Sequence, residues 1–163
     1  MILSDSNRIE RTAKRMAYQI VEEAHGADIL LIGLNERGFG LATLLKKFLI
    51  KASGKNIETF QLHVDSSNNS TLLTKGNENT VLVIVDDVIF SGSTVMKALD
   101  KITDRDRYQK IFVSVLVDRG HRKYPIEAAV IGIKIPTKLD EQIDVGLKDG
   151  IPNTIVLTEN KAQ

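Results

Sequence analysis

The chain has no cysteine, no tryptophan, only three prolines in 163 residues, and three histidines. Without cysteine neither a disulfide framework nor a thiolate metal site can form, which favours a reducing compartment. His25, His63 and His121 are too dispersed to suggest a zinc site. With 11 glycines and so few prolines there is no long low-complexity linker, and we expect a single domain over residues 1–163.

Long hydrophobic runs and an excess of one charge are missing as well. No run approaches the roughly 20 apolar residues that span a bilayer, and charges begin at Asp5, so we expect no signal peptide, no membrane contact and a cytoplasmic location. The net charge of +1 gives no overall attraction to nucleic acid. Any RNA binding would therefore need a local basic patch.

Apolar residues are present in two periodicities. Helical spacing from Ile9 to Ala24 predicts an amphipathic helix, whereas the continuous apolar run from Ile29 to Ile32 predicts a strand buried on both faces. The same patterns predict further strands at 57–64, 81–85 and 111–117, short strands near 128–133, 143–145 and 154–157, and helices at 39–50 and 94–102. Such alternation predicts an α/β fold with a mostly parallel central sheet flanked by helices.

The most informative stretch runs from Val81 to Thr94, where five apolar residues lead into Asp86 and Asp87 and then into a small hydroxyl-rich turn. Ligands bind at the carboxyl ends of parallel strands, and carboxylates are good acceptors for the two hydroxyls of a ribose. The amides of the turn lie at the start of a helix, where they can surround a phosphate. The candidate phosphate-binding residues are Val88, Ile89, Phe90, Ser91, Gly92, Ser93 and Thr94.

Two other interpretations of this stretch exist. A strand exit followed by a helix cap would give isolated acids and hydroxyls, but the ordered combination is less common. A receiver-type phosphoacceptor domain also has an acidic pair after a buried strand, but there the pair lies near the N-terminus, whereas here it is in the middle of the chain. A site for a 5-phosphoribosyl group is favoured.

On these residues the chain resembles the type I phosphoribosyltransferases, because the stretch 81–94 is similar to their phosphoribosyl-pyrophosphate signature. The stretch 113–137 is similar in particular to the bifunctional pyrimidine operon regulators that also act as uracil phosphoribosyltransferases. The resemblance implies a fold with a small hood, a homodimer or larger oligomer, and 5-phosphoribosyl 1-pyrophosphate with a pyrimidine base as substrates. It also implies Mg²⁺, with Asp118, Asp86 and Asp87 as the candidate metal residues.

A second anion-binding loop is predicted between the strand at 28–33 and the next helix, at Leu34, Asn35, Glu36, Arg37 and Gly38. The resemblance implies that this loop holds pyrophosphate, with a cis peptide bond between Leu34 and Asn35, and that Arg37 acts with Asp86 and Asp87 as a catalytic residue. A simple helix-capping loop is the alternative. Asn35 and Glu36 differ from the basic residue and threonine usual in such regulators.

The resemblance also assigns the base side of the site. It implies that Arg119 faces pyrophosphate or base and that Val117, Lys134, Ile135 and Pro136 form a hood over a uracil ring, which main-chain groups near Ile135 would recognise. A solvated charge run is the alternative for 119–123.

Three functions are compatible with these features. The first is transfer of the phosphoribosyl group to a base, for which the resemblance implies uracil in pyrimidine salvage. The second is a uridine-nucleotide-sensing RNA-binding regulator, suggested by the basic cluster at 119–123 and by the basic residues of the first helix, Arg8, Arg11, Lys14 and Arg15. The third is a nucleotide-binding homologue with weak or lost turnover, which the altered loop at 33–38 and the arginine-free stretch 65–76 favour.

Overall fold

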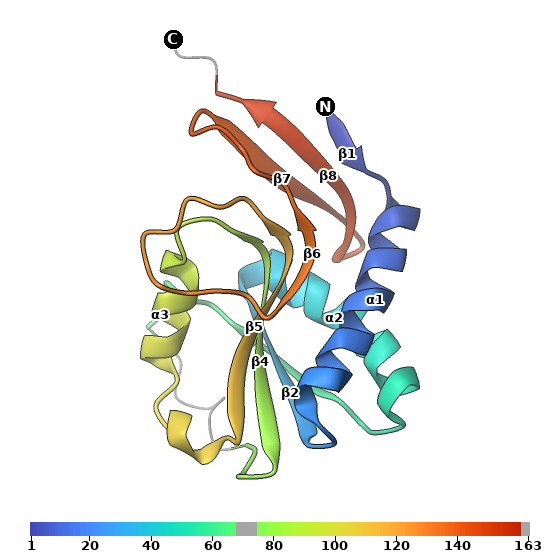
Figure 1. The fold of residues 1–163 in the computed structure, drawn as a ribbon, viewed down its shortest axis with the longest axis vertical. Helices are drawn as coiled ribbons and strands as arrows, with labels where there is room; N and C mark the ends of the chain where they lie inside the picture. The colour runs from blue at the N-terminus through green and yellow to red at the C-terminus, as the bar shows by residue number, and fades with distance from the viewer. Residues whose placement is uncertain (68–74, 161–163) are drawn as a thin grey trace.

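The computed structural model describes residues 1–67 and 75–160, and its centre is a five-stranded parallel sheet of order β3-β2-β4-β5-β6 (Figure 1). The predicted α/β class with a mostly parallel sheet is confirmed. The five strands are β2 (Asp28–Leu34), β3 (Glu58–Leu62), β4 (Thr80–Ile89), β5 (Lys110–Asp118) and β6 (Val130–Lys134). The most apolar segment of the sequence thus forms the central strand β4, which pairs with β2 and β5.

Helices cover both faces of this sheet. Figure 1 shows α1 (Ser6–Ala24) and α2 (Asn35–Ser53) on one face and α3 (Ser93–Lys101) on the other. Alternate residues of β4 serve the two sides, because Val83 and Val85 pack with α1 and α2 whereas Leu82 and Ile84 pack with α3. A 3₁₀ turn, η1 (Arg105–Arg107), leads from α3 towards β5.

A second sheet of three antiparallel strands lies beyond the carboxyl ends of the parallel strands (Figure 1). It consists of β1 (Ile2–Ser4), β8 (Ile151–Glu159) and β7 (Glu141–Lys148), and we call it the hood sheet. The hairpin turn between β7 and β8 has positive φ at Asp149 and Gly150. It sits close to α2, since a Cβ on Gly40 would lie 2.3 Å from the carbonyl oxygen of Gly150.

Some elements differ from the sequence-based expectation. The prediction of separate short strands at 143–145 and 154–157 underestimated a long hairpin, and β1 was not predicted because three residues carry no periodic signal. Helix α2 begins at Asn35 rather than at 39. The polar stretch 65–80, whose Ser, Asn and Gly content predicts a mobile loop, includes residues 68–74, which lie outside the described residues; Lys75 after them forms an ion pair of 3.7 Å with Glu58.

Helix α1 is anchored at its start and along one side. Asp5 caps its N-terminus by accepting the amide of Arg8 at 2.9 Å. Arg15 donates to the carbonyl oxygens of Ile131 (3.3 Å) and Gly132 on the outermost strand β6. Among the described residues, no helix has the length and apolar character needed to cross a membrane.

Candidate functional site

The two acids of the central strand lie inside β4 rather than after it, because β4 continues to Ile89. Asp86 is 6% exposed and Asp87 is half-buried. A carboxylate oxygen of Asp86 accepts the amide of Asp87 at 2.9 Å, and the buried group lies against α2, where a Cβ on Gly38 would be 3.3 Å from it. Burial first, and then the adjacent Asp87 carboxylate, raises the pKa of Asp86 well above its ordinary value.

Both acids line one cavity of about 480 Å³ at the carboxyl edge of the sheet. Both acids reach this cavity from within one strand, although successive side chains of a regular strand point to opposite faces. The cavity also takes in the first turn of α2 and the first turn of α3. Its lining residues are Leu34, Asn35, Glu36, Arg37, His63, Asp86, Asp87, Val88 and Thr94.

A smaller cavity of about 130 Å³ adjoins the first one and is formed by the segment after the acids. We call residues 88–94 the phosphate loop; all seven predicted phosphate-binding residues line this cavity, together with Asp86 and Val95. Gly92, with φ of 86°, turns the chain into α3. The N-cap residue Gly92 offers no side-chain cap; the amide of Ser93 donates to the hydroxyl of Ser91 at 3.2 Å, and the next amides of the first turn, at Thr94 and Val95, have no side-chain acceptor among the described residues.

The first turn of α2 forms the opposite wall of the larger cavity. Like α3, α2 has no side-chain cap at its N-terminus. All peptide bonds among the described residues are trans, so the expected cis bond between Leu34 and Asn35 is wrong. Asn35, with φ of 55°, makes the turn instead; its side-chain oxygen accepts the amide of Val64 (3.2 Å), and its main-chain oxygen accepts the Gln61 amide group (3.1 Å).

Arg37 is exposed in the first turn of α2 and links it to the hood sheet. Its Nε donates to the carbonyl oxygen of Val145 in β7 at 3.0 Å. Within residues 1–67 and 75–160 its two terminal nitrogens have no hydrogen bond. Because the guanidinium is held by one nitrogen and lines the larger cavity, the remaining fork can meet an anion there.

The residues predicted for the base side do not line either of these two cavities. Val117 is fully buried, whereas Lys134 at the end of β6 and Pro136 after it are exposed. The amide of Ile135 donates to the carbonyl oxygen of Asp118 at 2.9 Å. A main-chain donor at Ile135, expected to recognise the base, is therefore already occupied.

Arg119 is 9% exposed and turned towards the hood sheet. It donates to the hydroxyl of Thr137 (3.0 Å) and to the carbonyl oxygen of Glu141, and its guanidinium carbon lies 4.4 Å from the centre of the Phe90 ring. It therefore joins the phosphate loop to the hood sheet instead of presenting its charge to the cavity. The neighbouring Nε2 of His121 bonds the carbonyl oxygen of Thr137.

The predicted metal residues fit a divalent cation unequally. One oxygen of Asp118 accepts the amide of Gly120 (2.9 Å) and the other accepts Arg122 (2.8 Å). In the described part of the chain no group of three or more His, Asp or Glu side chains could hold an ion. Asp87 fits as a hard oxygen ligand at the cavity wall, so a Mg²⁺ ion would have to take most of its oxygens from a bound substrate and water.

Sequence reasoning missed one residue of the cavity. His63 follows β3 and lines the larger cavity. The sequence carried a signal for it, because it lies near the end of the strand predicted at 57–64, and parallel strands end at one edge of the sheet. The wide spacing of the three histidines argues only against a shared zinc site and does not exclude His63 from this cavity.

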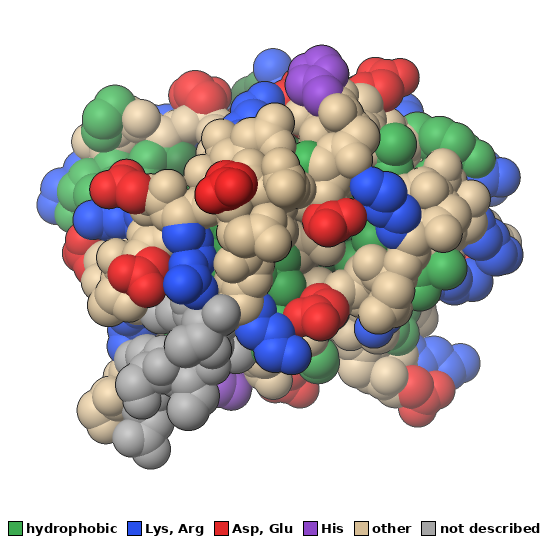
Figure 2. Space-filling model, turned by 90° about the horizontal axis from the view of Figure 1, so that it is seen from below, with side chains coloured by type: hydrophobic (Ala, Val, Ile, Leu, Met, Phe, Trp, Pro, Cys, Tyr) green, Lys and Arg blue, Asp and Glu red, His purple; other side chains and the backbone are tan. Residues whose placement is uncertain are grey.

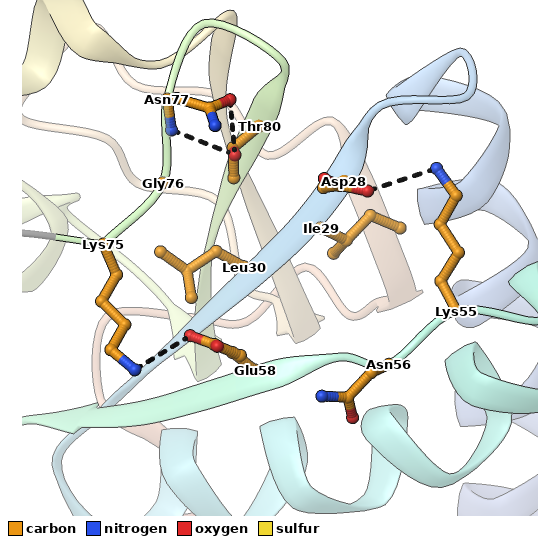
Figure 3. A pocket seen from close by; sticks show the side chains of 10 residues that line it. All are labelled: Asp28, Ile29, Leu30, Lys55, Asn56, Glu58, Lys75, Gly76, Asn77 and Thr80. Atoms are coloured by element: carbon orange, nitrogen blue, oxygen red, sulfur yellow. Dashed lines mark hydrogen bonds and ion pairs between the residues drawn. The ribbon is translucent and has the colours of Figure 1, made fainter.

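A third cavity, of about 570 Å³, lies at the opposite, amino edge of the sheet, which Figure 2 views from below and Figure 3 from close by. Its lysines are paired: Lys55 with Asp28 at 3.3 Å and Lys75 with Glu58 at 3.7 Å. Figure 2 shows acidic and basic side chains interspersed over this face. Despite its size, this cavity presents charges that are already matched.

The chain belongs to the phosphoribosyltransferase family, because the family model "Phosphoribosyl transferase domain" matches residues 2–148. It is 35% identical to "Bifunctional protein PyrR" of Bacillus cereus (strain AH820) and of Bacillus thuringiensis subsp. konkukian, each time over 91% of this chain and 91% of the relative. The resemblance to type I phosphoribosyltransferases, and among them to PyrR-like proteins, is thereby confirmed.

Solved structures share the fold at lower sequence identity. The hypoxanthine phosphoribosyltransferase of Trypanosoma cruzi superimposes with a TM-score of 0.76 at 19% identity, covering 99% of this chain and 97% of that one. A hypoxanthine-guanine phosphoribosyltransferase of Bacillus anthracis gives a TM-score of 0.66 at 23% identity, covering 96% and 97%. At these identities the likeness establishes the type I phosphoribosyltransferase fold.

Proposed function

We propose that this protein transfers the 5-phosphoribosyl group of 5-phosphoribosyl 1-pyrophosphate to uracil, giving UMP and pyrophosphate in pyrimidine salvage. The observation that carries the proposal is the shared edge of two adjoining cavities. Asp86, Val88 and Thr94 line both of them, and each cavity receives the uncapped first turn of a helix. A ligand with a ribose in the middle and an anionic group at either end matches this arrangement.

Each part of the donor then has a partner. Asp87 and Asp86 accept the ribose hydroxyls, and the phosphate loop surrounds the 5′-phosphate in the smaller cavity. The pyrophosphate lies against Leu34, Asn35 and Glu36 near the free nitrogens of Arg37. Gly38 acts behind them, because it lets the first turn of α2 approach Val85 and Asp86 closely. Since Arg37 is also bonded to β7, the hood sheet and the pyrophosphate side are held in register.

The chemistry fits a site without a nucleophile. Ribosyl transfer passes through an oxocarbenium-like centre, so the residues mainly orient the donor, stabilise the leaving group and exclude water. Mg²⁺, when bound with the donor, neutralises the charge that develops on pyrophosphate. Asp87 is the residue best suited to contact it, and Asp86 contributes to the same wall.

Uracil is proposed as the base from the likeness to PyrR-like proteins and not from contacts. With the Ile135 amide occupied, the free main-chain groups of 134–137 and the exposed Lys134 remain for base recognition. We further propose that residues 1–163 form one domain, that it acts in the cytoplasm, and that it associates as a homodimer or larger.

RNA-binding regulation is the second candidate, favoured by the likeness to PyrR-like proteins and by the basic face of α1. Arg11 and Lys14 are exposed there, next to the exposed Tyr18. Two of the expected contacts are weakened, because Arg15 bonds the carbonyls of β6 and Arg122 bonds Asp118. A gel shift with pyrimidine-operon leader RNA, with and without UMP, distinguishes this function from a plain enzyme.

The deciding experiment is a turnover screen with 5-phosphoribosyl 1-pyrophosphate and Mg²⁺, offering uracil, orotate, hypoxanthine, guanine and xanthine separately. We expect UMP from uracil alone, and no product when Mg²⁺ is removed with a chelator. Faster turnover of any other base would contradict uracil as the substrate. Binding of UMP in calorimetry without turnover of any base would instead identify a nucleotide-binding homologue.

A further inference from the structure

The back of the phosphate loop is held by main-chain bonds from residues 119–126, which we call the bracing segment. The carbonyl oxygen of Ser91 accepts two amides of this segment, those of Lys123 (2.9 Å) and Tyr124 (3.0 Å). The carbonyl oxygen of Ile89 accepts the amide of Arg119 at 3.0 Å. The first half of the loop is therefore fixed, at Ile89 and at Ser91, by the same neighbouring segment.

Arg122 completes this set of contacts between Ile89 and Ser91. Its Nη1 donates to the carbonyl oxygen of Phe90 at 2.9 Å, and its Nε donates to the carbonyl oxygen of Ile126 at 2.8 Å. Its Nη2 donates to the carboxylate of Asp118 at 2.8 Å, with both side chains largely buried at 15% and 10% exposure. Of the residues described, Arg122 is thus a bridge between the phosphate loop, the end of β5 and its own segment.

These bonds set the direction of the loop amides. In a planar trans peptide, the carbonyl of one residue and the N–H of the next point to opposite sides. Fixing the carbonyl oxygens of Ile89, Phe90 and Ser91 on the bracing segment therefore turns the amides of the following residues the other way. Phe90, Ser91 and Gly92 line the small cavity, so this orientation presents donors to an anion before one is bound.

We propose that Arg122 is a positioning residue for the 5′-phosphate, acting through the carbonyl of Phe90 while Asp118 holds its guanidinium in place. The inference rests on the proposed function for the identity of the anion. It assigns Asp118 to orienting Arg122, and it assigns Arg122 to the interior of the protein and not to a surface for RNA. Each of its three nitrogens donates to a group within the chain.

The test compares Arg122→Gln and Arg122→Lys with Arg105→Gln as a matched control. Arg105 also donates to a main-chain carbonyl, that of Leu99 at 3.1 Å, but it lies in η1, away from both cavities. Calorimetry measures binding of ribose 5-phosphate and, separately, of inorganic pyrophosphate. Amide hydrogen exchange at Lys123 and Tyr124 in the ligand-free protein reports on the bonds to Ser91 without any ligand, and thermal unfolding checks the fold.

We expect Arg122→Gln to weaken ribose 5-phosphate about 10- to 100-fold, the effect of losing charge-assisted hydrogen bonds in a buried site, with pyrophosphate binding unchanged. Exchange at Lys123 and Tyr124 should accelerate. Arg122→Lys should recover part of the affinity, because it keeps the charge but not the fork. Arg105→Gln should match wild type in every measurement.

Three results would overturn the inference. Unchanged affinity for ribose 5-phosphate in Arg122→Gln would exclude a positioning role, and so would unchanged amide exchange. Equal weakening of ribose 5-phosphate and pyrophosphate, with a lower unfolding temperature, would reduce Arg122 to a general structural residue. If wild type binds pyrophosphate and UMP but Arg122→Gln leaves the affinity for ribose 5-phosphate unchanged, the proposed function stands and only the inference is rejected. If wild type binds none of these ligands, both are rejected.

Discussion

The two edges of the parallel sheet carry similar residue types in opposite states. At the amino edge Asp28 and Glu58 are each paired with a lysine around the third cavity, of about 570 Å³. At the carboxyl edge Asp86 is buried with no ion pair to a cationic side chain of the described residues, and the N-cap residues of α2 and α3 make no side-chain hydrogen bond. The comparison teaches that unmatched polar groups, and not cavity size, mark the edge that is built to receive a ligand.

Neutralising Asp87, the half-buried acid of the carboxyl edge, should have the largest effect on turnover. Asp87→Asn keeps the shape of the side chain but removes its charge, and we expect turnover to fall about 10²- to 10³-fold, as when one preorganised group of an active site is lost. Asp28→Asn at the amino edge is the matched control and should keep wild-type turnover, since its carboxylate serves only an exposed ion pair. Initial rates of UMP formation provide the measurement. Equal turnover in the two variants, or none in wild type, would count against the proposed site.

Adding a side chain at Gly38, where α2 closely approaches β4, should have an intermediate effect on stability and turnover. A Cβ on Gly38 would lie 2.6 Å from the carbonyl oxygen of Val85, so Gly38→Ala must push α2 away from β4. Overpacking of this kind costs about 1–3 kcal/mol, and each kcal/mol lowers the unfolding temperature of a chain this long by about 2–4 °C. Turnover should fall with it, because the first turn of α2 moves.

The control for that change is Gly26→Ala at the amino edge. Gly26 has a positive φ, of 83°, which Gly38 does not have, and a Cβ there meets nothing within 4 Å. Only backbone strain is added, at about 1–2 kcal/mol, so the unfolding temperature should fall while turnover per folded molecule stays at the wild-type value. If Gly26→Ala lowered turnover as much as Gly38→Ala did, the two edges would not differ as described.

The smallest effect should be a pH-dependent change in stability at Asp86. Its pKa is raised in the native state by burial and by Asp87, so between the unfolded value of about 3.9 and that raised value the native protein binds more protons than the unfolded chain. Stability is therefore lost as the pH rises through this window. Asp86→Asn should exceed wild type in free energy of unfolding at neutral pH, and the difference should vanish as the pH falls below the window.

Urea unfolding from pH 3 to 8 measures this difference. Asp106→Asn, in the exposed turn η1, is the control and should run parallel to wild type across the range. A gap between Asp86→Asn and wild type that stays constant with pH would mean that the stabilisation does not come from the ionisation of Asp86.

The sequence predicted the parts of the site that depend on the chain's own local pattern. The run from Val81 to Val85 predicted a buried strand that leads into Asp86 and Asp87, and the small residues after them predicted the turn into α3. The class of fold followed from the alternation of periodicities. These features need no knowledge of distant contacts.

What the sequence could not supply were the contacts between distant segments. The bond from Arg37 to Val145 joins residues 108 positions apart, and that from Arg119 to Glu141 depends on how the hood sheet is seated. In a run of four basic residues between 119 and 123, nothing local separates an exposed Lys123 from a largely buried Arg122. Their roles are set by tertiary packing, which periodicity does not encode.

The position of Arg15 has a consequence for assembly. Strand β6 is an outer strand of the parallel sheet, and its free carbonyls would invite a neighbouring molecule to extend the sheet. The guanidinium of Arg15 occupies two of those carbonyls, at Ile131 and Gly132. Two copies joined through a continuous sheet at β6 would first have to displace that side chain.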